Sequence, residues 1–235
     1  MEHICGIVLR KIKYSDTRMI VDFFTDTRGR MSVLSNQKNL ALLDVVEFDA
    51  DIKPNGSLPL MRGLQRRYIM TSLRTDPMKS MVVMFLAEFL TNALREETEN
   101  RTLYDYVETS LLWFERAQDR YANFHLVFTL HISRFLGIYP NLDDCSPVMF
   151  YDLLHCCYRH GQPSHSYFLR PAEAKTLPYL FHMDYDNMHL YRFSRQQRMR
   201  ILCVMVDYYR IHIPGFRELK SLEVLQELCS DFDHQ

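Results

Sequence analysis

Three consecutive segments near the N-terminus decide the fold: Gly6-Ile-Val-Leu-Arg-Lys-Ile-Lys-Tyr14, Arg18-Met-Ile-Val-Asp-Phe-Phe-Thr-Asp26 and Thr27-Arg-Gly-Arg30. The first two are rich in apolar and β-branched residues, and turn-forming residues separate them, so we expect antiparallel strands over residues 4–14 and 18–25. Gly29 suits the positive φ of a tight hairpin turn. Cations stand among the apolar positions, a pattern typical of a small barrel that binds a polyanion.

The same alternation predicts further strands over residues 31–35, 45–52 and 67–73, with a turn at Pro54-Asn-Gly56 before the last of them. Five short strands within residues 1–75 are typical of an OB-fold. Adjacent rings point to opposite sides of a strand, so we expect either Phe23 or Phe24 to be exposed. On the first strand, the residues expected to face the core are Cys5, Ile7, Leu9 and Ile12, with a register break near Arg10-Lys11.

After Pro77 the spacing of the apolar residues changes from the alternation typical of strands to the spacing typical of one face of a helix. We expect helices over residues 77–95, 102–118 and 121–136, then irregular structure over residues 138–190. Ser194 and Gln197 form a capping-box pattern that opens a helix to about residue 211, and a last helix covers residues 221–229. The predicted fold is α+β: an OB-fold domain over residues 1–75, and an α-helical domain over residues 76–235 with an irregular insert at about 138–170.

Composition excludes several classes of protein. The chain has 235 residues, 47% of them hydrophobic, and only 7 glycines, and it contains no Gly-rich phosphate loop. The longest apolar run, residues 81–90, is interrupted by Glu88 and is too short to span a bilayer. Six cysteines without a secretion signal indicate reduced thiols. We therefore expect a cytoplasmic protein.

The net charge of −1 conceals an uneven distribution. Residues 1–75 carry 12 Lys and Arg against 8 Asp and Glu, whereas residues 76–235 carry 16 against 21. Within the second part, residues 190–220 carry seven cations against two anions. Binding of nucleic acid therefore requires these cations to gather locally.

The cations of the N-terminal strands are the first candidate site. Several cations along one groove hold phosphates, and exposed rings of Tyr14, Phe23 or Phe24 would stack on bases. The alternative is a solvated barrel surface over core aromatics, and charge alone does not separate the two interpretations. The predicted DNA-binding residues are Arg10, Lys11, Lys13, Arg18, Arg28, Arg30 and Lys38.

The basic segment near the C-terminus is the second candidate site. It predicts a surface for an acidic peptide tail or for phosphates, and its alternative is the solvated face of an amphipathic helix. The predicted contacts are Arg192, Arg195, Arg198, Tyr209 and Arg210.

Metal binding and catalysis are both disfavoured by residue spacing. The candidate metal ligands are Cys145, His155, Cys156, Cys157, His160 and His165. Cys145 has no second cysteine three residues on, and adjacent cysteines chelate poorly, so we expect no zinc and no other cofactor. Because no Gly-x-Ser-x-Gly elbow or comparable signature is present, we expect that the chain is not an enzyme.

Three motifs resemble one known family. The opening Gly6-Ile-Val-Leu-Arg10, the turn Phe135-Leu-Gly-Ile-Tyr-Pro-Asn-Leu142 and the run Leu219-Lys-Ser-Leu-Glu-Val-Leu225 are similar to the bacterial recombination mediators of the RecO family. The resemblance extends from residue 4 to about residue 228. The segment Tyr185-Asp-Asn-Met-His-Leu190 resembles the Bacteroidetes branch, in which the zinc ligands are largely absent.

The resemblance implies an OB-fold followed by a helical domain, and a non-enzymatic role in DNA repair and homologous recombination. Members of the family bind single- and double-stranded DNA, anneal complementary strands, and act with RecR, in some cases with RecF. They help to load RecA onto DNA coated with single-strand-binding protein, whose acidic tail binds the helical domain. Two departures stand out: only Cys145 occupies a zinc-ligand position, and the loop Ser35-Asn-Gln-Lys-Asn39 is short. The alternative function is a protein-binding adaptor that uses the barrel edge without touching DNA.

Overall fold

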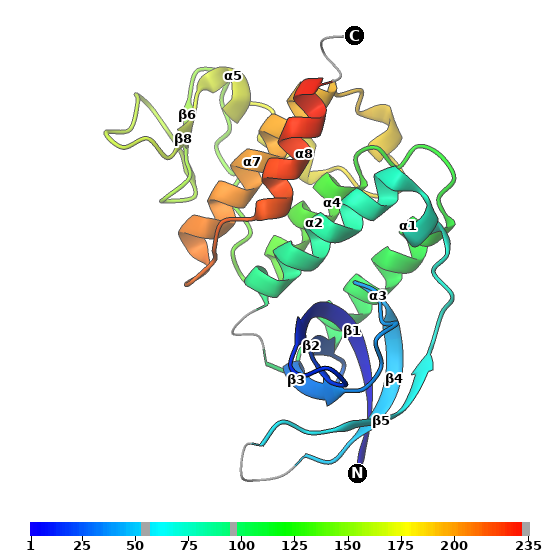
Figure 1. Ribbon diagram of the computed structural model, residues 1–235. Helices are drawn as coiled ribbons and strands as arrows, with labels where there is room; N and C mark the ends of the chain where they lie inside the picture. The colour runs from blue at the N-terminus through cyan, green and yellow to red at the C-terminus, as the bar shows by residue number, and fades with distance from the viewer. Residues whose placement is uncertain (53–56, 95–97, 232–235) are drawn as a thin grey trace. The chain divides into compact units, whose positions relative to one another are not determined.

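The computed structural model describes residues 1–52, 57–94 and 98–231 (Figure 1). The chain divides into two compact units, one of Met1–Ala117 with Glu218–Leu228 and one built on Gln118–Arg217. Compact units are defined by contacts, whereas domains are defined by independent folding. The predicted boundary at residues 75 and 76 therefore stays a prediction.

The first unit begins with a five-stranded antiparallel sheet in the order β3-β2-β1-β4-β5. Its strands are β1 (Glu2–Lys13), β2 (Met19–Thr25), β3 (Gly29–Ser35), β4 (Val45–Ala50) and β5 (Met61–Arg66). The edge strands meet where the backbone N–H of Leu34 donates to the carbonyl of Pro59 at 2.8 Å. The sheet thus curls into a small barrel, which confirms the predicted fold class of an OB-fold followed by helices.

A β-bulge in β1 allows one strand to serve both halves of the barrel. Val8 is paired with Phe23 and Arg10 with Asp22, so Leu9 is the extra residue. Before the bulge β1 also pairs with β4, and after it β1 pairs only with β2. Bulges bend a strand and increase its twist, as barrel closure requires. The irregularity expected near residues 10 and 11 is one or two residues earlier.

The side chains of β1 that fill the barrel interior are not the ones expected from the sequence. Ile4 and Val8 belong to the interior cluster, whereas Ile12 is exposed. The Cβ that an alanine would add at Gly6 lies only 2.9 Å from Phe23 Cδ1, so glycine lets the Phe23 and Phe48 rings meet with centroids 4.8 Å apart. The predicted inward face was wrong because β1 packs against helix α2 (Pro77–Ala93) on its other side, which buries both faces.

The expectation that one of the adjacent rings is exposed was also wrong. Phe23 and Phe24 are both fully buried. Phe23 lies inside the barrel, and Phe24 packs outside it against Tyr104 of helix α3 (Arg101–Arg116), with centroids 5.9 Å apart. Phe24 is buried because α3 covers the outer surface of the barrel and forms a second apolar layer there.

The fifth strand lies earlier than residues 67–73. Its sequence, Met61-Arg-Gly-Leu-Gln-Arg66, is too polar to stand out, and the apolar residues after it lead instead into the short helix α1 (Ser72–Thr75). Ile69 among them is exposed. The turn predicted at residues 54–56 lies outside the described residues.

Buried or capping polar groups fix the helices of the first unit. Asp76 caps α2 by accepting from the backbone N–H groups of Met78 and Lys79. The buried ammonium of Lys79 donates to Ser72 Oγ at 2.6 Å and to the carbonyl of Ala117 at 2.5 Å, which joins α1, α2 and the end of α3. Burial lowers the pKa of Lys79. The last helix, α8 (Lys220–Asp231), returns to this unit with its residues as far as Leu228.

The second unit is helical with a small sheet. It contains α4 (Phe124–Phe135), α5 (Pro171–Ala174), α6 (Leu177–Phe181), the 3₁₀ helix η1 (Met188–Leu190) and α7 (Arg195–His212). The capping box of Ser194 and Gln197 is confirmed.

The region expected to be irregular in fact includes a three-stranded sheet. Its strands are too short to show a periodic pattern in the sequence, so they were not predicted. They are β6 (Phe150–Asp152), β7 (Cys157–Arg159) and β8 (Phe168–Leu169). Among the described residues, no helix combines the length and apolar character needed to cross a membrane.

Candidate nucleic-acid interface

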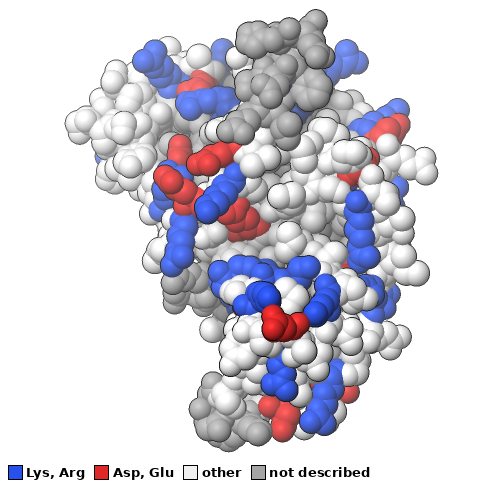
Figure 2. All heavy atoms as spheres, in the orientation of Figure 1, with Lys and Arg blue, Asp and Glu red and all other residues white. Residues whose placement is uncertain are grey.

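Two barrel cations share one buried carboxylate. Asp22 of β2, 2% exposed, accepts from Arg10 Nε at 3.0 Å, Arg30 Nη2 at 3.3 Å and Ser32 Oγ at 2.6 Å. Burying a charge is tolerated when it is paired and hydrogen-bonded. Two guanidinium groups on one carboxylate leave a net positive charge, and Figure 2 shows Lys and Arg side chains gathered over the barrel.

A second buried carboxylate organises cations around the segment of residues 39–44. Asp44 is bound by Arg66, Nε to Oδ2 at 3.4 Å, and by Arg74. Arg66 also donates to the carbonyl of Asn39 at 2.8 Å, and Lys11 donates to the carbonyl of Leu40. Sequence reasoning missed Arg66 and Arg74 because they come from a later strand and helix. Their proximity to Lys11 depends on the tertiary fold.

The structure distinguishes among the seven predicted DNA-binding cations. Arg28 is held by Glu2 through both carboxylate oxygens, at 2.7–3.0 Å, and these hydrogen bonds raise the pKa of Arg28 and lower that of Glu2. Lys13 is paired with Asp16 at 3.0 Å. The side chain of Arg30 is only 18% exposed and also donates to the carbonyl of Thr91. These three cations are already engaged within the protein.

Arg18 and Lys38 are the most available of the seven. Both are exposed, and within the part of the chain that the structure describes neither side chain has an ion pair. Arg10 is paired but half exposed. Of the three rings considered for base stacking, only Tyr14 is exposed, since Phe23 and Phe24 are buried. Arg10, Arg18 and Lys38 with Tyr14 are therefore the exposed part of the predicted site, and Lys11 is half-buried where it donates to the carbonyl of Leu40.

The predicted peptide-tail residues do not form one cluster. Arg195 and Arg210 are fifteen residues apart on α7, or about 22 Å along its axis. Tyr209 is fully buried, and its hydroxyl donates to the carbonyl of Thr129 at 2.7 Å, so it cannot contact a peptide on the surface. Arg198 lies near the start of α7 and donates to the carbonyl of Phe193 at 2.6 Å. Arg192 is exposed just before the helix.

An apolar groove lies instead between α7 and the α5–α6 segment. Its volume is about 470 Å³, and the apolar side chains of Leu177, Leu180, Ile201 and Val204 line it. At its rim Arg200 is paired with Glu173, Nε to Oε1 at 2.7 Å. Sequence reasoning placed the site on the cations of α7 and missed the groove, because its second wall comes from the region expected to be irregular.

The candidate metal ligands of the insert divide into separate groups. His155 Nδ1 and His165 Nε2 lie 2.8 and 3.3 Å from the carboxylate of Asp152, which sequence reasoning did not consider. Burial raises the pKa of Asp152, but hydrogen bonds from His155 outweigh this effect and lower it. The thiol of Cys156 contacts instead the hydroxyl of Tyr208 at 3.1 Å. The cysteines and histidines thus do not form a joint tetrahedral set, and the absence of zinc stays a prediction.

Known proteins can be aligned with nearly the whole chain. Residues 74–223 match the family model described as "Recombination protein O C terminal". The chain is 44% identical over 235 residues to the DNA repair protein RecO of Phocaeicola vulgatus, covering 96% of this chain and 98% of the relative. It is 43% identical over 234 residues to the RecO of Bacteroides fragilis, covering 95% and 97%. The corresponding protein of Flavobacterium psychrophilum is 30% identical over 237 residues, covering 96% and 98%.

Proposed function

The chain belongs to the RecO family of DNA repair proteins, and from this premise we propose that it is a recombination mediator that binds DNA through its N-terminal barrel. The proposed role is non-enzymatic. It consists of binding single- and double-stranded DNA, annealing complementary strands and helping to load RecA onto DNA coated with single-strand-binding protein. RecR is the proposed partner in loading, with RecF as a further one.

The observation that carries the proposal is the set of cations around the barrel. Lys11, Arg66 and Arg74 are all held at the segment of residues 39–44, and Lys38 is exposed in the adjoining loop. Two backbone carbonyls and the single buried carboxylate of Asp44 fix the positions of three of these side chains but leave a net positive charge. Such an arrangement holds phosphates without reading bases, so affinity should depend steeply on salt and little on sequence.

The test is a salt titration of the affinity for a single-stranded oligonucleotide. We expect the triple variant Lys11→Gln, Arg18→Gln, Lys38→Gln to reduce the slope of log Kd against log salt concentration by roughly 2. The reason is that each lost phosphate contact removes about 0.7 from this slope. The matched control, Arg192→Gln, Arg195→Gln, Arg210→Gln, removes the same total charge from the second unit. Equal losses in both variants would contradict a site on the barrel.

We further propose that the acidic tail of single-strand-binding protein docks in the groove beside α7. The groove offers an apolar surface for side chains of the tail, and Arg192, which precedes the lining residue Phe193, supplies an exposed cation near it. Arg200 at the rim is paired with Glu173 and would have to exchange this partner for the tail. This assignment replaces Tyr209 and Arg210 as contacts, because the first is buried and the second lies at the far end of α7.

The competing function is a protein-binding adaptor that contacts DNA only incidentally. It predicts binding to RecR with little affinity for oligonucleotides at any salt concentration. The same titration separates the two functions, since a mediator gains affinity steeply as salt falls. Binding that is weak and insensitive to salt would favour the adaptor.

A further inference from the structure

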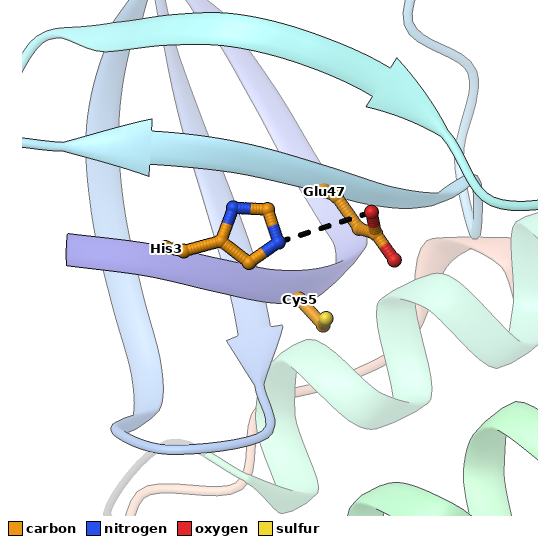
Figure 3. Close-up of side chains that lie close together, drawn as sticks. All are labelled: His3, Cys5 and Glu47. Carbon is orange, nitrogen blue, oxygen red and sulfur yellow. Dashed lines mark ion pairs between the residues drawn. The ribbon is translucent and has the colours of Figure 1, made fainter.

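Three potential metal ligands converge on the outer surface of the barrel (Figure 3). His3 and Cys5 lie two apart on β1, so their side chains share one face of the strand, and Cys5 is directly opposite Glu47 of β4. One ligand atom of each of these three residues lies within 4.8 Å of the others, and His3 Nε2 is 3.8 Å from Glu47 Oε2. Ligand atoms around a tetrahedral zinc ion are roughly 3.3–3.8 Å apart, so small side-chain rotations would complete the geometry.

Neighbouring groups orient two of these ligands. Asp49, the cross-strand partner of His3, lies 3.2 Å from His3 Nδ1, so this ring nitrogen is engaged and Nε2 is left for a metal. Histidine ligands in proteins usually donate their second ring nitrogen to a carboxylate in this way. Arg67 Nε lies 3.1 Å from Glu47 Oε1, which leaves Oε2 facing His3.

We propose that His3, Cys5 and Glu47 form a site for a divalent transition metal, with zinc as the best match, that ties strand β1 to strand β4. One nitrogen, one thiolate and one carboxylate are the ligand types that zinc takes, and a water molecule would complete four-coordination. The charges also balance, because the thiolate and the carboxylate together offset the ion. The guanidinium of Arg67, which contacts Glu47, is also paired with Glu108 at 2.9 Å.

The site would be structural, since it bridges two strands on the barrel wall. A metal that binds only the folded barrel stabilises it by mass action. The proposal departs from the expectation of a metal-free protein and concerns residues outside the insert. It rests on the barrel geometry alone, so it does not depend on the proposed DNA binding.

The test is a titration of the untagged, chelator-treated full-length chain with Co²⁺, which reports bound thiolate through a sulfur-to-cobalt charge-transfer band. We expect the band to saturate at one equivalent of Co²⁺, to disappear on addition of Zn²⁺ and to be absent from Cys5→Ser. His3→Gln and Glu47→Gln should weaken binding at least tenfold, and Asp49→Asn about tenfold. Zn²⁺ should raise the melting temperature of the wild-type chain by several degrees, and that of Cys5→Ser should not change.

The controls come from the second unit. Cys156→Ser removes a different thiol, and His155→Gln with His165→Gln removes the other cluster of potential ligands, at Asp152. Both variants should keep the band. Absence of the band from the wild type, its persistence in Cys5→Ser, or its loss in Cys156→Ser would each overturn the proposal. His3 is 64% exposed, so His3→Gln tests the site even if Cys5→Ser fails to fold.

Discussion

The carboxylate of Glu88 on α2 caps the N-terminus of α8, 133 residues later in the chain: Oε2 accepts from the backbone N–H of Ser221 at 2.8 Å and from its hydroxyl at 2.5 Å. Oε1 accepts from the backbone N–H of Lys220 at 3.1 Å. A negative charge at a helix N-terminus is favourable because unpaired N–H groups and the helix dipole both attract it. This contact gives a physical role to the Lys220-Ser-Leu run that helped to identify the family.

Glu88→Gln should therefore lower the free energy of unfolding by about 1–2 kcal/mol, since it removes a charged cap. The measurement is urea unfolding. Ser221→Ala alone and the double variant complete a mutant cycle, and we expect the two losses to be less than additive. Fully additive losses would mean that the two residues do not act through the contact between them.

Gly6→Ala should destabilise the barrel by about 1–3 kcal/mol, because the new methyl group would meet Phe23 at 2.9 Å in a filled interior. The cost should be smaller in a Phe23→Leu background, where the clashing ring atom is absent. Thermal or urea unfolding of the four proteins checks both statements. An equal cost in both backgrounds would indicate that backbone conformation, not packing, requires glycine here.

Asp22→Asn should destabilise the barrel by about 2–3 kcal/mol, since it leaves two guanidinium groups beside a buried amide that carries no charge. Arg10→Gln should cost less, under about 1 kcal/mol, because Arg10 is half exposed and Arg30 still neutralises the carboxylate. Urea unfolding at low salt compares the two variants. A larger loss from Arg10→Gln would contradict the role of Asp22 as the shared partner.

His125 should make the stability fall as the pH is lowered. Burial, with the nearby Arg198 guanidinium, lowers its pKa to about 4. The unfolded chain, with a histidine pKa of about 6.5, therefore binds a proton first, and stability is lost as pH falls from about 6.5 towards 4. His125→Gln should reduce this loss by about 1–2 kcal/mol. The measurement is the difference in the free energy of unfolding between the wild type and His125→Gln, taken at pH 7 and at pH 4.5. The same difference at both pH values would show that His125 does not cause the loss of stability.

Val204→Glu should weaken binding of the acidic tail peptide at least tenfold, because it places a negative charge in the apolar groove. The matched control is Val148→Glu, the same substitution at a site in the second unit that is 70% exposed and does not line the groove. Fluorescence anisotropy of a labelled peptide compares them. Equal effects of the two substitutions would remove the groove from the proposed function.

Local sequence determined the parts of this protein that depend on near neighbours in the chain. The first three strands, the positive φ of Gly29 and the capping box of Ser194 and Gln197 follow from short-range patterns, and the structure has all of them. The motifs around Pro140 and Ser221 identified the family for a related reason, since they can be recognised without knowing what they contact.

The tertiary structure alone decided which side chains are available. Phe24 is buried because α3 covers the outside of the barrel. Tyr209 is buried beside α4, where its hydroxyl donates to the carbonyl of Thr129, 80 residues earlier in the chain. The cations were equivalent in sequence, yet Arg28 is neutralised by Glu2 whereas Arg18 and Lys38 stay exposed. The physical reason is that burial and charge pairing depend on residues far apart in the chain, whose meeting is set by the packing of whole elements.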